Sequence, residues 1–100
     1  MGRVAGKVAI VTGAARGMGA AFARRLVEEG AAVMLTDVLE QEGQSTARAL
    51  GDKARFLRHD VTSEAQWRTV IGETESLFGP VSVLVNNAGI VRYAPLESMT

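Results

Sequence analysis

Short apolar runs alternate with longer segments of helical periodicity, and this alternation limits the chain to few folds. The apolar runs cover residues 7–12, 32–36, 54–59 and 81–86. A continuous apolar run of this length is typical of a strand buried on both faces. Strands that alternate with helices form a parallel sheet with helices on both sides, because crossovers are right-handed. The chain is therefore predicted to be an α/β protein.

The first helical segment is expected at residues 17–29. Met18, Phe22 and Leu26 fall four residues apart, so they share one side of this helix. Apolar residues at this spacing usually mark the side that packs against the core. This spacing predicts a helix here, and Gly30 is placed to end it.

Two further helices follow. The second is expected at residues 39–50, although it contains Gly43, a poor helix former. Thr62 or Ser63 can cap the third helix, and Gly79 followed by proline ends it. The third helix has an apolar face made of Trp67, Val70, Ile71, Thr74 and Phe78. Residues 54–59 form the most polar of the strands, which we expect nearer an edge of the sheet.

The composition excludes several classes of function. Eleven basic and eleven acidic residues cancel, so no overall field favours nucleic acid or an anionic membrane. There is no cysteine, and the single histidine, His59, is expected to be a surface or packing residue rather than to catalyse or bind a metal. No apolar run approaches the roughly 20 residues that cross a bilayer, and none resembles a secretion signal. We expect a cytoplasmic protein.

A glycine-rich stretch joins the first strand to the first helix. Gly13, Gly17 and Gly19 form the pattern Gly-x-x-x-Gly-x-Gly. Glycines let backbone approach a pyrophosphate, and the positive end of the helix attracts its charge. The stretch is neither Gly-x-Gly-x-x-Gly, because Phe22 replaces the last small residue, nor a P-loop. An S-adenosylmethionine-binding enzyme stays open, although such enzymes usually carry an acid after the first strand.

An aspartate follows the second strand. Asp37 comes eighteen residues after Gly19, where a carboxylate can accept hydrogen bonds from the adenosine ribose. The same carboxylate would repel the 2′-phosphate of NADP. Arg16 argues for NADP, because a guanidinium can pair with that phosphate. Since a buried like-charge contact costs more than one mobile arginine gains, we expect NAD.

The third strand is followed by Asp60 and Val61. The Asp60 carboxylate can accept a hydrogen bond from the amino group of adenine, and Val61 can pack on the ring. The alternative is that Asp60 serves only as the entry to the third helix.

The fourth strand ends in Asn86 and Asn87, followed by Ala88 and Gly89. Asparagine side chains at the end of a buried strand need partners, which the loop after the first strand can supply. The two small residues allow a cofactor to lie against the backbone. A simple turn is the alternative.

Together these motifs resemble the cofactor-binding motifs of the short-chain dehydrogenase/reductase family, in order and spacing, over the whole chain. Residues 15–19 and 37–43 are similar to the NAD-dependent hydroxysteroid dehydrogenases of the 3α/20β type. The resemblance implies a doubly wound Rossmann domain, of which residues 1–100 supply the first four strands and three helices. It also implies a homodimer or homotetramer.

The resemblance assigns roles to particular residues. Asp37 would hold the ribose hydroxyls, and Asp60 and Val61 would hold adenine. The pyrophosphate and adenosine ribose would be lined by Gly13, Arg16, Gly17, Met18 and Gly19. The ribose beside the nicotinamide would lie along Asn87, Ala88 and Gly89.

The family transfers a hydride between a nicotinamide cofactor and a secondary alcohol or ketone. For this chain the resemblance implies NAD(H) as the cofactor, and a hydroxysteroid is one candidate substrate. Its catalytic residues are a serine and a Tyr-x-x-x-Lys motif. The only tyrosine here, Tyr93, is followed four residues later by Glu97, so no catalytic residue is predicted. Met99 and Thr100 read as the approach to another helix, so we expect the domain to continue and the fragment alone to be inactive. A nucleotide-binding regulator without catalysis is the alternative.

Overall fold

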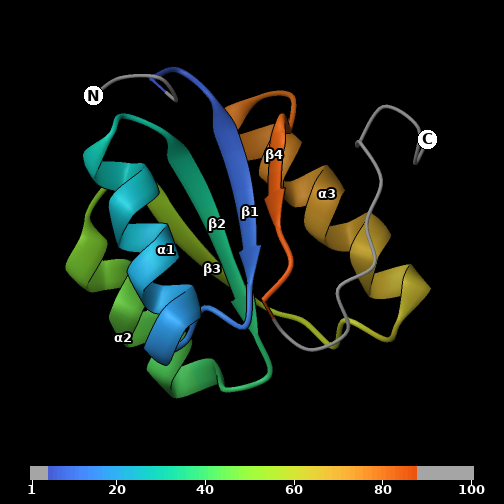
Figure 1. Cartoon of the computed structure of the whole chain (residues 1–100). Helices are drawn as coiled ribbons and strands as arrows, with labels where there is room; N and C mark the ends of the chain where they lie inside the picture. Colours follow the sequence, from blue (N-terminus) through green and yellow to red (C-terminus); the bar gives the residue numbers. More distant parts are fainter. Residues whose placement is uncertain (1–4, 88–100) are drawn as a thin grey trace.

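The computed structural model describes residues 5–87. Four parallel strands form one sheet in the order β3-β2-β1-β4, with helices on both faces (Figure 1). The elements are β1 (Val8–Thr12), α1 (Gly17–Glu28), β2 (Ala32–Asp37), α2 (Glu40–Leu50), β3 (Ala54–Arg58), α3 (Glu64–Phe78) and β4 (Val83–Val85). The α/β prediction is confirmed, and only the ends of the elements differ from it.

The strand order reverses beside β1. The chain passes from β1 to β2 to β3 in one direction, and β4 then pairs with the other side of β1. Val11 consequently lies between Leu35 of β2 and Val85 of β4. In a parallel sheet such a reversal is where ligands bind, beyond the carboxyl ends of the strands. Among the described strands β3 lies at an edge, as its polar residues predict.

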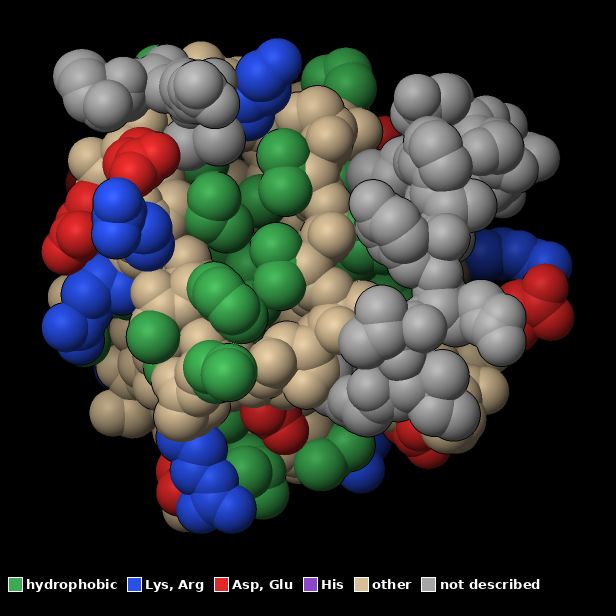
Figure 2. All heavy atoms as spheres, viewed as in Figure 1, with side chains coloured by type: hydrophobic (Ala, Val, Ile, Leu, Met, Phe, Trp, Pro, Cys, Tyr) green, Lys and Arg blue, Asp and Glu red, His purple; other side chains and the backbone are tan. Residues whose placement is uncertain are grey.

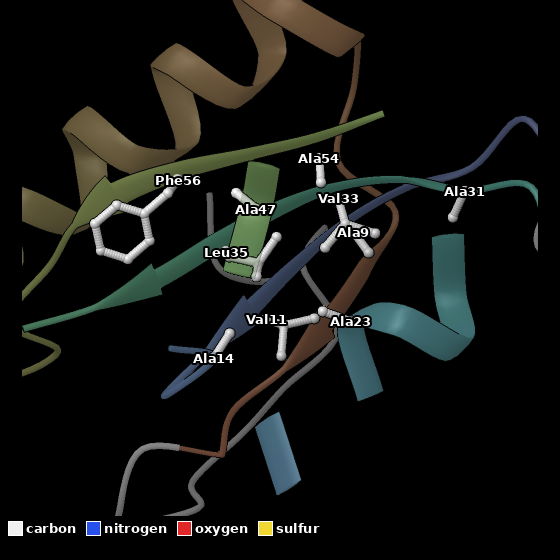
Figure 3. Close-up of a cluster of buried hydrophobic side chains, with 10 residues drawn as sticks. All are labelled: Ala9, Val11, Ala14, Ala23, Ala31, Val33, Leu35, Ala47, Ala54 and Phe56. Atoms are coloured by element: carbon white, nitrogen blue, oxygen red, sulfur yellow. The ribbon is translucent and has the colours of Figure 1, made fainter. Parts of the chain in front are cut away.

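The face that carries α1 and α2 is packed with small side chains (Figure 3). Gly43 of α2 is buried, and a Cβ there would overlap the ring of Phe56 on β3. Ala47, one helical turn further on, is also buried. The glycine that weakens the helix prediction is therefore what lets α2 approach the sheet closely.

α1 does not pack against the sheet through the large apolar side chains of its first turns. Met18 and Phe22 are 64% and 43% exposed, whereas Gly19 and Ala23 are buried. A Cβ on Gly19 would overlap the carbonyl of Gly13, so the helix rests directly on the backbone of the preceding loop. Large side chains would hold the helix away, and so they point outward. Figure 2 shows several hydrophobic side chains exposed on the face that carries α1.

The opposite face is packed by α3. Val70 of α3 packs with Ile10 of β1 and Met34 of β2, and Trp67 and Ile71 pack against this cluster. The predicted apolar face of the third helix is thus confirmed. Of the two proposed caps the structure has Ser63, whose Oγ accepts a hydrogen bond from the backbone N–H of Gln66 at 3.2 Å.

His59 belongs to the same side of the sheet as α3 and is 1% exposed. Its Nδ1 lies 3.1 Å from the hydroxyl of Thr36, and its ring meets the Trp67 ring edge-on at 4.4 Å between centroids. Burial lowers the pKa of His59, an effect that the nearby Asp60 carboxylate opposes. Of the two roles that the sequence left open for His59, surface or packing, the structure has packing.

Candidate nucleotide-binding site

The loop between β1 and α1 has a backbone that requires glycine. Gly13 and Gly17 have φ of 61° and 65°, a region that L side chains rarely adopt. A Cβ on Gly17 would meet nothing within 4 Å, so this glycine borders open space. The loop is held to β2 by the N–H of Ala14, which donates to the carbonyl of Thr36 at 3.0 Å. The glycine loop is thus hydrogen-bonded to β2 and open beside Gly17.

The N-terminus of α1 begins in this loop. Its cap residue, Arg16, has an extended backbone and makes no side-chain capping hydrogen bond. The first turn of the helix contains no acidic residue. The first N–H groups of a helix lack partners within the helix and carry a partial positive charge, so they suit an anion such as a pyrophosphate.

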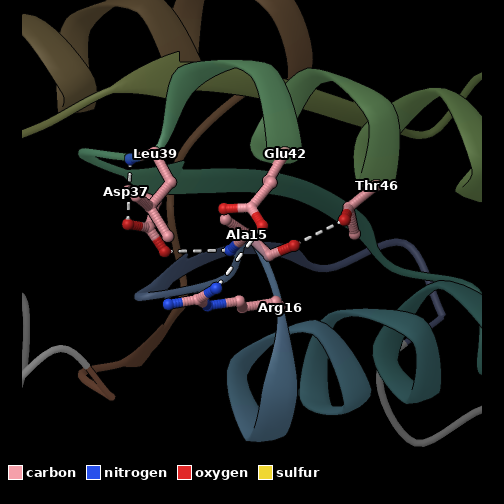
Figure 4. Close-up of polar contacts among 6 residues, drawn as sticks. All are labelled: Ala15, Arg16, Asp37, Leu39, Glu42 and Thr46. Atoms are coloured by element: carbon pink, nitrogen blue, oxygen red, sulfur yellow. Dashed lines mark hydrogen bonds and ion pairs between the residues drawn. The ribbon is translucent and has the colours of Figure 1, made fainter.

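Asp37 is the last residue of β2 and reaches across to the glycine loop (Figure 4). One carboxylate oxygen accepts from the N–H of Ala15 at 3.0 Å, and the other accepts from the N–H of Leu39 at 3.1 Å. Asp37 therefore fastens the loop to the end of β2, a role that sequence reasoning missed. Because each carboxylate oxygen can accept more than one hydrogen bond, capacity remains for ribose hydroxyls.

Thr12 joins the ends of β1 and β4. Its hydroxyl lies 3.0 Å from Oδ1 of Asn86 and accepts a hydrogen bond from the N–H of Asn87 at 2.9 Å. The Asn87 side chain donates to the carbonyl of Gly13 at 3.4 Å. The expectation that the asparagines find partners beside the first strand is confirmed. Thr12 precedes the glycine pattern in the matched motif, but no role of its own is predicted from the sequence for this fully buried side chain.

Asp60 takes up the alternative role that the sequence left open. Its Oδ1 accepts from the N–H and the hydroxyl of Thr62, at 2.9 and 2.6 Å. These hydrogen bonds are the main reason that the pKa of Asp60 is lowered. The carbonyl of Val61 accepts from the indole N–H of Trp67 at 2.9 Å. Both residues therefore shape the entry to α3, and their contact with adenine stays a prediction.

The structure brings most of the predicted residues to one edge of the sheet. The glycine loop, Arg16, Asp37 and Asn87 meet at the carboxyl ends of β1, β2 and β4, and Asp60 follows β3. Met18 and Gly19 lie in the first turn of α1. Ala88, Gly89 and Tyr93 lie outside the described residues.

Neither a metal centre nor a membrane span is found in residues 5–87. No group of three His, Asp or Glu side chains there is placed to hold a metal ion. No helix in the same range is long and apolar enough to cross a bilayer.

The geometry defines a candidate ligand site at the reversal of strand order in a parallel sheet. Residues 7–100 match the family model described as short chain dehydrogenase, so the chain belongs to this family.

Individual relatives agree with this assignment. The chain is 48% identical over 96 residues to a 3-alpha-(or 20-beta)-hydroxysteroid dehydrogenase of Mycobacterium tuberculosis, covering 96% of this chain and 37% of the relative. It is 45% identical over 100 residues to an NADP-dependent (R)-specific alcohol dehydrogenase of Lentilactobacillus kefiri, covering 98% of this chain and 40% of that one.

A solved structure shares the fold. A 3-ketoacyl-(acyl-carrier-protein) reductase of Brucella melitensis, complexed with NADH, superposes with a TM-score of 0.83 at 38% identity, over 87% of this chain and 36% of the reductase. The chain thus spans well under half the length of the relatives that it matches.

Proposed function

We propose that the chain forms the cofactor-binding part of an oxidoreductase that transfers a hydride between NAD(H) and a secondary alcohol or ketone. The observation that carries this proposal is the position of the Asp37 carboxylate beside the loop that leads into α1. A pyrophosphate suits the helix N-terminus, and the hydroxyls of an adenosine ribose suit the carboxylate. The N-terminus of α1 and the Asp37 carboxylate lie next to each other, so a single dinucleotide could contact both.

The resemblance to the family supplies the roles of the remaining residues in this proposal. The pyrophosphate and its ribose would be lined by Gly13, Arg16, Gly17, Met18 and Gly19, adenine by Asp60 and Val61, and the nicotinamide side by Asn87, Ala88 and Gly89. The conformations of Gly13 and Gly17 and the uncapped helix fit such a ligand. The bound cofactor supplies the chemistry of accepting or donating a hydride.

The substrate and the remaining catalytic parts belong to the same proposal. The relative from Mycobacterium tuberculosis acts, by its name, on hydroxysteroids, which makes a hydroxysteroid the first substrate to test. The length of the relatives supports a single domain of which residues 1–100 are the N-terminal part. We expect no turnover from these 100 residues alone, because they contain no Tyr-x-x-x-Lys motif.

A binding titration tests the cofactor assignment. For the full-length protein we expect NAD to bind about tenfold or more tightly than NADP, since hydrogen bonds to a charged group contribute about 1.5–3 kcal/mol. Asp37→Asn should abolish most of this preference. Asp52→Asn is the matched control, because Asp52 is an exposed aspartate between α2 and β3, away from the glycine loop.

Three results would contradict the proposal. The first is tighter binding of NADP than of NAD, and the second is equal effects of the two substitutions. The third is intact NAD binding without turnover of any secondary alcohol, which would instead support the nucleotide-binding regulator. Thermal unfolding of Asp37→Asn shows whether the variant keeps its fold, since Asp37 also fastens the loop.

A further inference from the structure

Arg16 favours NADP and Asp37 favours NAD. The structure places a third charged side chain, Glu42, beside Arg16. Nη1 of Arg16 lies 3.4 Å from Oε2 of Glu42, a residue in the first turn of α2 (Figure 4). The only cation of the glycine loop is therefore already paired with a carboxylate that the sequence motifs did not single out.

The docking of α2 on the glycine loop brings Glu42 close to Arg16. Thr46, one turn after Glu42, donates its hydroxyl hydrogen bond to the carbonyl of Ala15 at 2.6 Å. Residues four apart share one side of a helix, so Glu42 and Thr46 both face the loop. The buried Gly43 brings this helix close to the sheet. Glu42 thus stands beside Arg16 because of the fold of α2.

The surface that follows Asp37 is acidic. A hollow of about 520 Å³ is lined by Val38, Leu39, Glu40, Gln41 and Glu42. It contains two carboxylates and no basic side chain. The hollow therefore offers a 2′-phosphate no cation that could replace Arg16.

We propose that Glu42 is a positioning residue for cofactor selectivity: its carboxylate pairs with Arg16 and withholds that guanidinium from a 2′-phosphate. The proposal rests on the proposed binding of NAD(H) at this site. Asp37 rejects the phosphate directly, whereas Glu42 removes the one group that would compensate for the rejection. The side chains of Arg16 and Glu42 are 71% and 49% exposed, so solvent screens the pair and its contribution is small. The effect is accordingly a few-fold change in affinity.

The experiment is a binding titration of the full-length protein with NAD, NADP and adenosine 2′,5′-bisphosphate. Glu42→Gln should tighten binding of the two 2′-phosphate ligands about three- to fivefold and leave NAD within twofold. Glu40→Gln is the matched control, since it removes the same charge from the same helix turn without an ion pair among residues 5–87. In an Arg16→Gln background, Glu42→Gln should produce no gain.

The control and the double variant separate two explanations. Equal gains from Glu40→Gln and Glu42→Gln would overturn the proposal, because a general acidic field would then explain the selectivity. A gain from Glu42→Gln that persists without Arg16 would overturn it as well. If NAD binds and only the Glu42 effect fails, the proposed function stands. If neither dinucleotide binds, both fall.

Discussion

On the face of the sheet that carries α1 and α2, six of the ten buried cluster residues are alanines, whereas the α3 face is filled by Ile10, Met34, Val70 and the ring of Trp67. Small residues allow the backbones of helix, loop and strand to approach closely. Large residues fill space and hold the helix further off. The first arrangement brings Asp37 and Glu42 each into contact with the glycine loop. The arrangement on the α3 face stabilises the opposite side of the sheet and does not contribute to these contacts.

The largest effect is expected for Gly19→Ala. The added Cβ would overlap the carbonyl of Gly13, and backbone cannot move aside as a side-chain end can. We expect the free energy of unfolding to fall by about 3 kcal/mol and NAD binding to weaken, because the glycine loop must shift. Urea unfolding and a binding titration measure both. An unchanged stability would show that α1 does not rest on the loop.

Gly43→Ala should have the next largest effect. Here the new Cβ would overlap the ring of Phe56, a side chain that can be replaced. The expected loss is about 2 kcal/mol. Phe56→Leu should recover part of it in the double variant, so a double-mutant cycle should show favourable coupling. Additive losses would mean that α2 and β3 are not in the tight contact described.

A pH titration probes the α3 face. Burial lowers the pKa of His59, so the unfolded chain binds the extra proton first as the pH falls below about 6.5. The free energy of unfolding therefore has its full value above that pH. It falls as the pH decreases from there to the pKa of His59 in the folded protein. His59→Gln should flatten this decline in unfolding curves measured between about pH 5 and 8. Asp60, whose pKa is lowered too, acts only in a separate window below about pH 4.

The smallest effect, and the opposite sign, is expected for Gly72→Ala. Gly72 lies within α3, and a Cβ there would meet nothing within 4 Å. Alanine should therefore stabilise the protein by about 0.5–1 kcal/mol, through helix propensity alone. The midpoint of urea unfolding measures the gain. Destabilisation by this substitution would show that α3 also packs closely at its glycine.

The sequence was most informative where local chemistry decides the structure. The sequence predicts the strands and helices because apolar runs, glycines and the cap residue Ser63 determine the backbone conformation of the residues next to them. Gly13 and Gly17 were identified because only glycine readily takes the backbone conformations of that loop. The partners of the asparagines followed from the need of buried polar groups for hydrogen bonds.

The failures concern contacts between distant segments. Met18 and Phe22 share one side of the first helix, yet close docking buries the smaller Gly19 and Ala23 instead, which the spacing of apolar residues does not reveal. Asp37 was understood as a ligand residue only, although it holds the N–H of Ala15, 22 positions away. No local sequence pattern predicts a hydrogen bond between residues so far apart in the chain.

The sequence by itself determined the α/β alternation, the glycine loop and the chemistry available at the ends of the strands. Only the tertiary structure decided the strand order, the side on which α1 docks, and the pairing of Arg16 with Glu42. The physical reason is that propensity and periodicity act over a few residues. Which face docks, and which charges meet, depends on how closely two backbones can approach, and that distance exists only once both are folded.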